Sequence, residues 1–156
     1  EKSKIVYCRD SNRSERHLHA SFTFLGFTFR PRKARSPQGG PSFTSFLPGA
    51  SESALKRMRQ AVRGWRLNRQ THVTLADVAR LYNPVIHGWW NYYGAFYKTA
   101  MLRIFQHIDC ALERWARRKY KGLHRRKRRS AEWLDRMRHN NPMLFAHWRV
   151  VTQPAG

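Results

Sequence analysis

Acidic residues are scarce in this sequence of 156 residues, because nine Asp and Glu stand against 31 Lys and Arg and leave a net charge of +22. Such an excess of one sign repels itself unless a polyanion neutralises it. Nucleic acid is the partner that this composition favours. No apolar run approaches the length that spans a bilayer, and the basic segments alternate with aromatic residues, so no membrane anchor is expected.

Cysteine is nearly absent as well. Cys8 and Cys110 lie far apart, and neither belongs to a paired Cys motif. We therefore expect no disulfide framework and a reducing, cytoplasmic setting. His17 and His19 have no second ligand pair at zinc-like spacing, so neither a metal nor another cofactor is predicted.

The first 48 residues have the composition of strands and turns. Residues 4–8 and 22–30 are β-rich runs, and Gly26 within the second marks a bulge or a close backbone approach. Residues 31–48 are rich in Pro, Gly, Ser and basic residues and indicate a flexible connector, near whose end Phe43, Phe46 and Leu47 favour a short strand returning to the hairpin. The chain starts at Glu1 rather than Met, which suggests that the natural protein continues upstream.

The remaining residues carry helical periodicity. Apolar residues recur every three or four positions from Ala54 to Trp65, and again over residues 99–120, with a core side that includes Leu102. Thr74 and Asp77 fit a capping box for a helix over residues 75–82, after which a break at Pro84 starts a second helix. A short helix over residues 131–139 and a strand or packing plug over 145–151 complete an α+β fold that is mainly α.

Spaced cations follow one face of the first predicted helix. No Glu four residues away compensates them, so like charges repel on this face, which favours phosphate binding over the alternative of a merely solvated surface. The candidate contacts are Lys56, Arg59, Arg63, Arg66 and Arg69.

Residues 81–96 concentrate large aromatic side chains. Trp89, Tyr93 and Phe96 share one helical face suited to a core, whereas Trp90 and Tyr92 point elsewhere. Rings outside the core, near polar side chains and arginines, are a surface on which RNA bases stack, although all of these rings can equally belong to the core. The candidate stacking group is His87, Trp90, Asn91 and Tyr92.

The densest basic stretch follows residue 113. It can be a nuclear-import-like patch, a disordered tail or a phosphate-binding arm, and the interleaved aromatic Tyr120 favours the arm. The candidate contacts here are Arg114, Arg117, Arg118, Lys121, Arg125 and Arg126.

Two motifs together resemble a known family. They are Phe24-Leu25-Gly26-Phe27 followed by Arg30, and Leu81-x-Asn83-Pro84-x-Ile86-x-Gly88-Trp89-x-Asn91-Tyr92-Tyr93. This combination is similar to the C-terminal part of group II intron-encoded reverse transcriptases, their maturase-specific domain, and the resemblance covers nearly the whole chain. It implies an end-of-palm β-hairpin with its connector over residues 1–48, a helical thumb or maturase domain over 49–122, and a basic arm and tail over 123–156.

The resemblance implies an RNA-binding module that assists splicing by holding structured group II intron RNA in its active fold. One alternative is a thumb fragment that grips a template-primer, either DNA or an RNA–DNA duplex, for a reverse transcriptase palm on a longer or separate chain. Another is a degenerate remnant of a mobile element.

The polymerase motif of that family is missing. Polymerase chemistry needs convergent carboxylates for two magnesium ions, which the family carries in a Tyr-x-Asp-Asp motif. The aspartates of this sequence are Asp10, Asp77, Asp109 and Asp135, and no two are adjacent. A Cys-rich nuclease module is missing as well. The sequence therefore predicts that this chain alone is not an enzyme.

Overall fold

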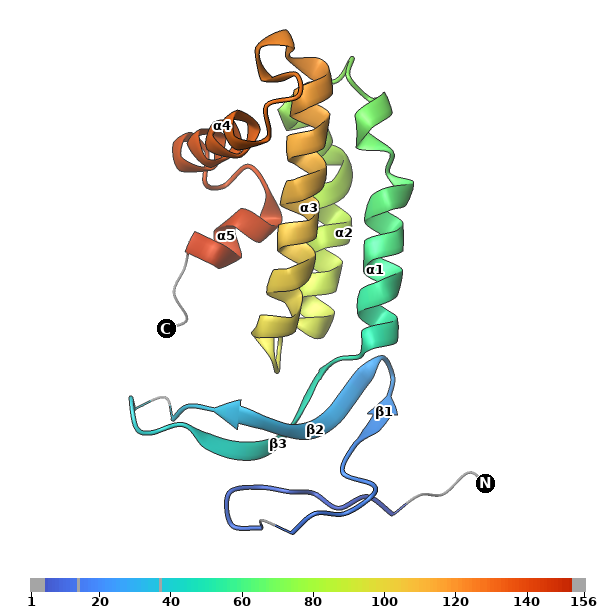
Figure 1. The fold of residues 1–156 in the computed structure, drawn as a ribbon, viewed down its shortest axis with the longest axis vertical. Helices are drawn as coiled ribbons and strands as arrows, with labels where there is room; N and C mark the ends of the chain where they lie inside the picture. Colours follow the sequence, from blue (N-terminus) through green and yellow to red (C-terminus); the bar gives the residue numbers. More distant parts are fainter. Residues whose placement is uncertain (1–4, 14, 37, 153–156) are drawn as a thin grey trace.

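The computed structural model describes residues 5–13, 15–36 and 38–152. A three-stranded antiparallel sheet lies at one end of the molecule, and a bundle of helices stands on it (Figure 1). This arrangement confirms the predicted α+β, mainly α fold class. Among the described residues, no helix combines the length and the apolar character needed to cross a bilayer.

The sheet consists of β1 (Phe22–Phe24), β2 (Phe27–Ala34) and β3 (Phe43–Ala50), in that order. The prediction of one strand over residues 22–30 is wrong, because the chain reverses at Leu25 and Gly26, whose φ angles are 48° and 81°. Two residues with positive φ form the tight turn whose twist matches an antiparallel hairpin. The returning strand is confirmed as β3, which pairs with β2 along its whole length, and the two strands together occupy most of the segment expected to be a flexible connector.

The N-terminal run holds no strand in its described part, residues 5–8, and Lys4 lies outside the described residues. Its backbone is tied to the next segment instead, where the Tyr7 amide donates to the His19 carbonyl at 2.8 Å. A single backbone bond of this kind joins two loops and does not extend the sheet. The expectation of a strand here is therefore wrong.

The helix after β3 is confirmed as α1 (Glu52–Gly64), which begins where the Ser51 hydroxyl accepts the Ala54 amide at 3.1 Å. A short 3₁₀ turn, η1 (Leu67–Arg69), follows it. The capping box is also confirmed at the start of α2 (Leu75–Tyr93), with Thr74 and Asp77 bonded in both directions. These caps satisfy backbone amides that have no partner within the helix.

The predicted helix break at Pro84 is wrong, because α2 continues through this residue. Proline removes one amide donor, so the carbonyl of Arg80 loses its helical partner. Both Arg80 and Pro84 are exposed, so the missing hydrogen bond falls on the solvent side of α2. The neighbouring Asn83 does not cap a helix and serves a contact with the C-terminal segment instead.

Helix α3 (Lys98–Lys119) runs through the centre of the bundle. Its Ile108, Leu112 and Trp115 are at most 1% exposed, whereas Leu102, predicted to face the core, is 38% exposed. A second 3₁₀ turn, η2 (Lys121–Leu123), and α4 (Lys127–Asn140) follow, so this helix starts earlier than predicted. The last element is α5 (Ala146–Thr152), which makes the C-terminal plug a helix rather than a strand.

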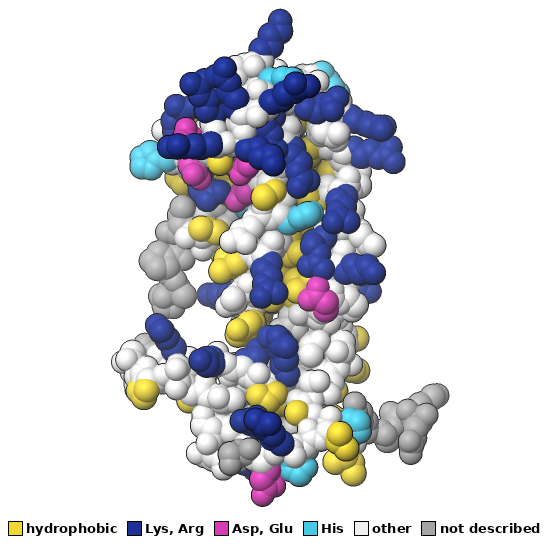
Figure 2. Space-filling view, viewed as in Figure 1, with side chains coloured by type: hydrophobic (Ala, Val, Ile, Leu, Met, Phe, Trp, Pro, Cys, Tyr) yellow, Lys and Arg dark blue, Asp and Glu magenta, His cyan; other side chains and the backbone are white. Residues whose placement is uncertain are grey.

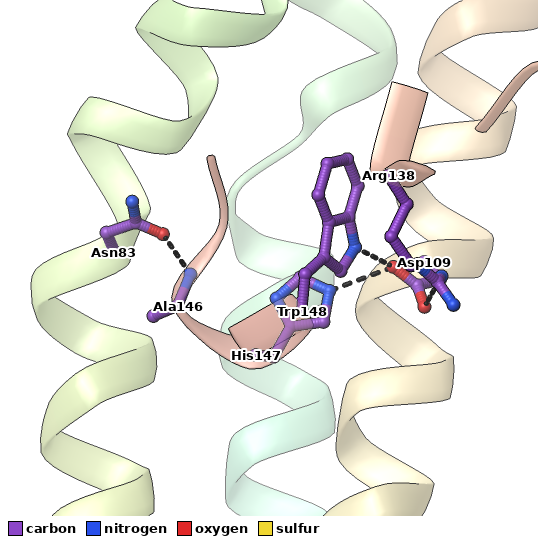
Figure 3. Close-up of polar contacts among 6 residues, drawn as sticks. All are labelled: Asn83, Asp109, Arg138, Ala146, His147 and Trp148. Carbon is purple, nitrogen blue, oxygen red and sulfur yellow. Dashed lines mark hydrogen bonds and ion pairs between the residues drawn. The ribbon is translucent and has the colours of Figure 1, made fainter. Parts of the chain in front are cut away.

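Asp109 of α3 fastens the C-terminal helices to the bundle (Figure 3). Its carboxylate accepts from Arg138 Nη2 at 2.6 Å and Trp148 Nε1 at 3.0 Å, and its Oδ1 lies 2.8 Å from His147 Nε2. On the other side, Asn83 Oδ1 accepts the Ala146 amide at 2.9 Å. His147 and Trp148 are fully buried, so α5 completes the core that all five helices share.

Candidate nucleic-acid interface

A groove of about 480 Å³ lies between the end of α1, η1, α3 and the segment after η2. None of the described residues that line it is acidic, and we name it the arginine groove. Figure 2 shows Lys and Arg gathered over this upper end of the bundle and along its α1 and α3 side. The basic residues that line the groove are Arg63, Arg66, Arg114, Arg117, Arg118, His124 and Arg125.

Helix geometry explains why these side chains meet. Arg114 and Arg118 are four residues apart in α3 and therefore share one face of that helix. Helix α1 packs beside α3 and brings Arg63 to the same cleft. Arg66 enters it from the turn between α1 and η1, and Arg125 from the loop after η2. Three segments thus place guanidinium groups in one cleft, and the first of them, with Arg63 and Arg66, is far from the other two in sequence.

Two of the groove arginines occupy strained backbone positions. Arg66 has φ 48° and ψ 42°, and Arg125 has φ 59°. In the described part of the chain, Leu25 is the one other non-glycine residue with a positive φ. The left-handed region costs an L-residue about 1 to 2 kcal/mol, and the position after a helix C-cap is one where Gly is preferred. Strain of this kind concentrates at functional sites.

The field of the groove extends along α3 to His107. Burial lowers the pKa of this imidazole below its ordinary value of 6.5, and the charges of Arg63, Arg114 and Arg59 lower it further. His107 is therefore neutral at neutral pH. Arg59, Arg63 and Arg114 thus all lie close enough to act on this one side chain, which places positive charge beside it at the seam of α1 and α3.

Two of the predicted phosphate contacts already have protein partners. Arg117 donates to the Ser130 hydroxyl at 2.7 Å and lies 3.6 Å from Glu113, with a side chain that is 18% exposed. It therefore joins α3 to α4 at the wall of the groove. Arg59 forms an ion pair with Glu52 at 2.7 Å. The remaining predicted cations, which are exposed but do not line the groove, are Lys56, Arg69, Lys121 and Arg126.

The rings of Trp90 and Tyr92, predicted to stack on bases, contact other elements of the protein. Trp90 is half-buried, with its ring centroid 5.7 Å from that of Phe105. Tyr92 donates its hydroxyl to the Leu25 carbonyl at 2.9 Å, and its ring lies 5.2 Å from that of Phe27, so it joins α2 to the sheet. Stacking of Trp90 and Tyr92 on bases stays a prediction. His87 and Asn91 are exposed on α2, outside the groove lining.

The predicted core face of this segment is only partly buried. Trp89 is half-buried and stacks on Trp65 with centroids 6.0 Å apart, and Tyr93 packs against Phe27. Phe96 is 62% exposed, so its placement in the core is wrong. Helix α2 ends at Tyr93, and the helical spacing that assigned Phe96 to this face does not extend beyond that point.

Sequence reasoning missed two groove or seam residues on α3, Arg103 and His107. A signal for both was present, because Arg103, His107 and Arg114 follow a spacing of four and seven residues, which is one helical stripe. The prediction for this helix used only its apolar stripe, which lies on a different face.

Fold and site together define a mainly helical α+β protein with an arginine-lined groove suited to a polyanion. Residues 55–133 match the family model described as "Group II intron, maturase-specific domain", and this span is slightly more than half of the chain. The chain belongs to this family. The matched span includes every residue that lines the arginine groove. No curated protein matches the chain significantly, and neither does any solved structure.

Proposed function

We propose that this chain is an RNA-binding maturase module, which assists splicing by holding group II intron RNA in its active fold. The observation that carries the proposal is the convergence of arginines from three segments on one groove within the matched span. Arg is suited to phosphate because its planar fork of donors matches the oxygens of that group. The RNA supplies the catalytic chemistry, and the protein supplies charge and shape.

The proposal is tested by binding of a structured group II intron and of an unrelated duplex of equal length, each at several salt concentrations. Neutralised phosphates release counterions, so affinity for the intron should fall steeply with salt. Arg63→Ala and Arg114→Ala should each lower the slope of log affinity against log salt by about one. Arg136→Ala is the matched control, because Arg136 is exposed on α4 and does not line the groove.

Equal affinity for the intron and the unrelated duplex would contradict a maturase role and leave only non-specific binding. Unchanged salt slopes in both groove variants would show that the RNA does not contact the groove. A splicing assay with the same variants then separates binding from function, because a loss of splicing should follow the loss of affinity.

A second candidate function, a thumb that works with a reverse transcriptase palm, is favoured by the sheet. Its edge strand β1 exposes Phe24 by 61%, and the turn beside it exposes Leu25 by 67%. Exposed apolar side chains on an unpaired strand edge are typical of a surface that another strand covers. Competition between the intron and a template-primer duplex distinguishes the two functions, since a thumb should prefer the template-primer.

We also propose that the chain alone has no polymerase activity. Two of its four aspartates already serve structural contacts, since Asp77 caps α2 and Asp109 holds the C-terminal helices. These carboxylates are not positioned to hold a pair of magnesium ions. Templated product from the purified chain in a primer-extension assay would contradict this.

A further inference from the structure

A second pocket, of about 240 Å³, lies where the sheet meets the first turns of α1 and α3, and we name it the sheet pocket. Strand β2 contributes Arg30 and Arg32, and α3 contributes Arg103. Glu52 is the one acidic residue that lines it, and its carboxylate is paired with Arg59 at 2.7 Å. The sheet pocket therefore carries an excess of positive charge.

Arg32 is a buried cation with neutral partners. It is 8% exposed, it donates to the carbonyls of Leu47 and Thr28 at 3.3 Å each, and its guanidinium lies 4.4 Å from the Tyr97 ring centroid. Burial, and then the charge of Arg30, lower its pKa below the ordinary value. Among the described residues, no carboxylate forms an ion pair with the three pocket arginines.

The start of α3 adds to the same preference for an anion. This helix has 22 residues, and its N-cap, Tyr97, makes no side-chain capping bond. Thr99 and Ala100 of the first turn line the pocket. Amides in a first turn that lack a cap point at whatever lies before the helix, and the helix dipole favours negative charge there. A buried unpaired cation and an uncapped helix start thus meet in one cavity.

The sheet pocket is aligned with the arginine groove. Arg103 and Arg114 are eleven residues apart in α3, which is about 16 Å of helix and three turns plus about 20° of rotation. They therefore share one face, with His107 between them.

We infer that the sheet pocket binds one backbone phosphate of the RNA strand that occupies the arginine groove. The inference rests on the proposed function, because it names a second anchor for the same ligand. The pocket fixes the position of the RNA relative to the sheet, whereas the groove alone fixes it relative to the helices. RNA bound at both sites therefore holds the sheet and the bundle together.

The test is the double variant Arg30→Gln with Arg103→Gln, which leaves the buried Arg32 in place. Both side chains are exposed and make no ion pair within the described chain, so the fold should be unchanged, which a thermal melt checks. Loss of one phosphate contact should lower the salt slope for intron RNA by about one. The control is Arg136→Gln with Arg129→Gln, which removes equal charge at two exposed residues that line neither the groove nor the sheet pocket and form no ion pair among the described residues, and it should leave the slope unchanged.

The results distinguish a failure of the sheet-pocket inference from a failure of the proposed function. If Arg63→Gln lowers the slope and the double variant does not, the sheet pocket is no RNA contact and this inference is overturned while the proposed function stands. If the unmodified chain shows no preference for the intron, the proposed function itself fails. The Nε resonance of Arg32 tests the source of the phosphate: it should shift with RNA. A shift with inorganic phosphate alone, with an unchanged RNA slope, would make the pocket a site for free phosphate and overturn the inference.

Discussion

Arg66 lines the arginine groove and has a strained backbone conformation with a positive φ. Replacement by Gly removes both the cation and the left-handed strain, whereas replacement by Ala removes the cation alone. We expect Arg66→Gly and Arg66→Ala to lower the salt slope of RNA binding equally, by about one. In urea unfolding, the Gly variant should be the more stable of the two by about 1 kcal/mol. Equal stability of the two variants would show that the turn carries no strain.

His107 gives the interface a dependence on pH. Because burial and three arginines lower the pKa of this residue in the folded state, the unfolded chain takes up the proton first as pH falls. Stability should therefore be full above pH 6.5 and decrease as the pH falls from there through the lowered folded pKa. Phosphates beside these arginines should raise the pKa again, so RNA binding should be accompanied by proton uptake.

An NMR titration of the His107 ring with and without intron RNA measures this effect. The midpoint should move to higher pH when RNA binds, and the movement should shrink at high salt because counterions screen the same charges. A midpoint that RNA leaves unchanged would place the strand away from the α1 and α3 seam. His107→Gln, which cannot titrate, should show no proton uptake at this site.

At the scale of the elements, one carboxylate contacts both C-terminal helices, because Asp109 accepts from Arg138 of α4 and from Trp148 of α5. Asp109→Asn keeps the shape of the side chain but leaves Arg138 without its counterion. Breaking a partly buried pair of this kind should cost about 2 to 4 kcal/mol in urea unfolding. The control is Glu132→Gln, which removes an exposed pair with Arg128 and should change stability by less than about 1 kcal/mol. Similar effects of the two variants would show that Asp109 is not the fastening point.

Trp148 and Trp89 differ in burial, so their replacement by Ala should lower the free energy of unfolding by different amounts. Trp148 is fully buried, so Trp148→Ala should cost about 3 to 5 kcal/mol. Trp89, placed in the core by its spacing, is only half-buried and stacks on Trp65. Trp89→Ala should therefore cost less than Trp148→Ala, and denaturant unfolding of both variants measures the difference. The reverse order would contradict the burial that the structure assigns.

Local signals predicted some of these elements and not others. The cap at Thr74 and the apolar stripe of α3 depend on neighbouring residues, so the sequence was sufficient to locate both helices. Asn83, which the sequence assigned to a helix cap before Pro84, contacts a segment about sixty residues away instead, through hydrogen bonds with Leu144 and Ala146. A contact between segments so far apart leaves no periodic pattern in the local sequence.

The same limit applies to the interface. The spacing of Arg63 and Arg66 in one segment, and of Arg114 and Arg118 in another, indicated two basic faces. Their union in one groove follows from the packing of α1 on α3, which is tertiary. The packing roles of Trp90 and Tyr92 are tertiary as well, because their partners come from α3 and the sheet.

At the scale of the whole molecule, one core includes residues from all five helices and from the end of β3. A shared core predicts one cooperative unfolding transition. Circular dichroism, which reports the helices, and tryptophan fluorescence, which reports the core, should therefore give the same midpoint. Two separate midpoints, or no transition, would favour the alternative of a degenerate remnant.

The cationic side chains of the arginine groove, apart from His124, are all arginines, with no lysine among the described residues that line it. A guanidinium keeps its proton throughout the physiological range and beyond, whereas an ammonium group can be neutralised by acetylation. Acyl transfer to lysine therefore has no target in this cleft. Its attraction for a polyanion therefore does not depend on lysine acetylation, and the amount of protein or the supply of competing ions is left to adjust binding.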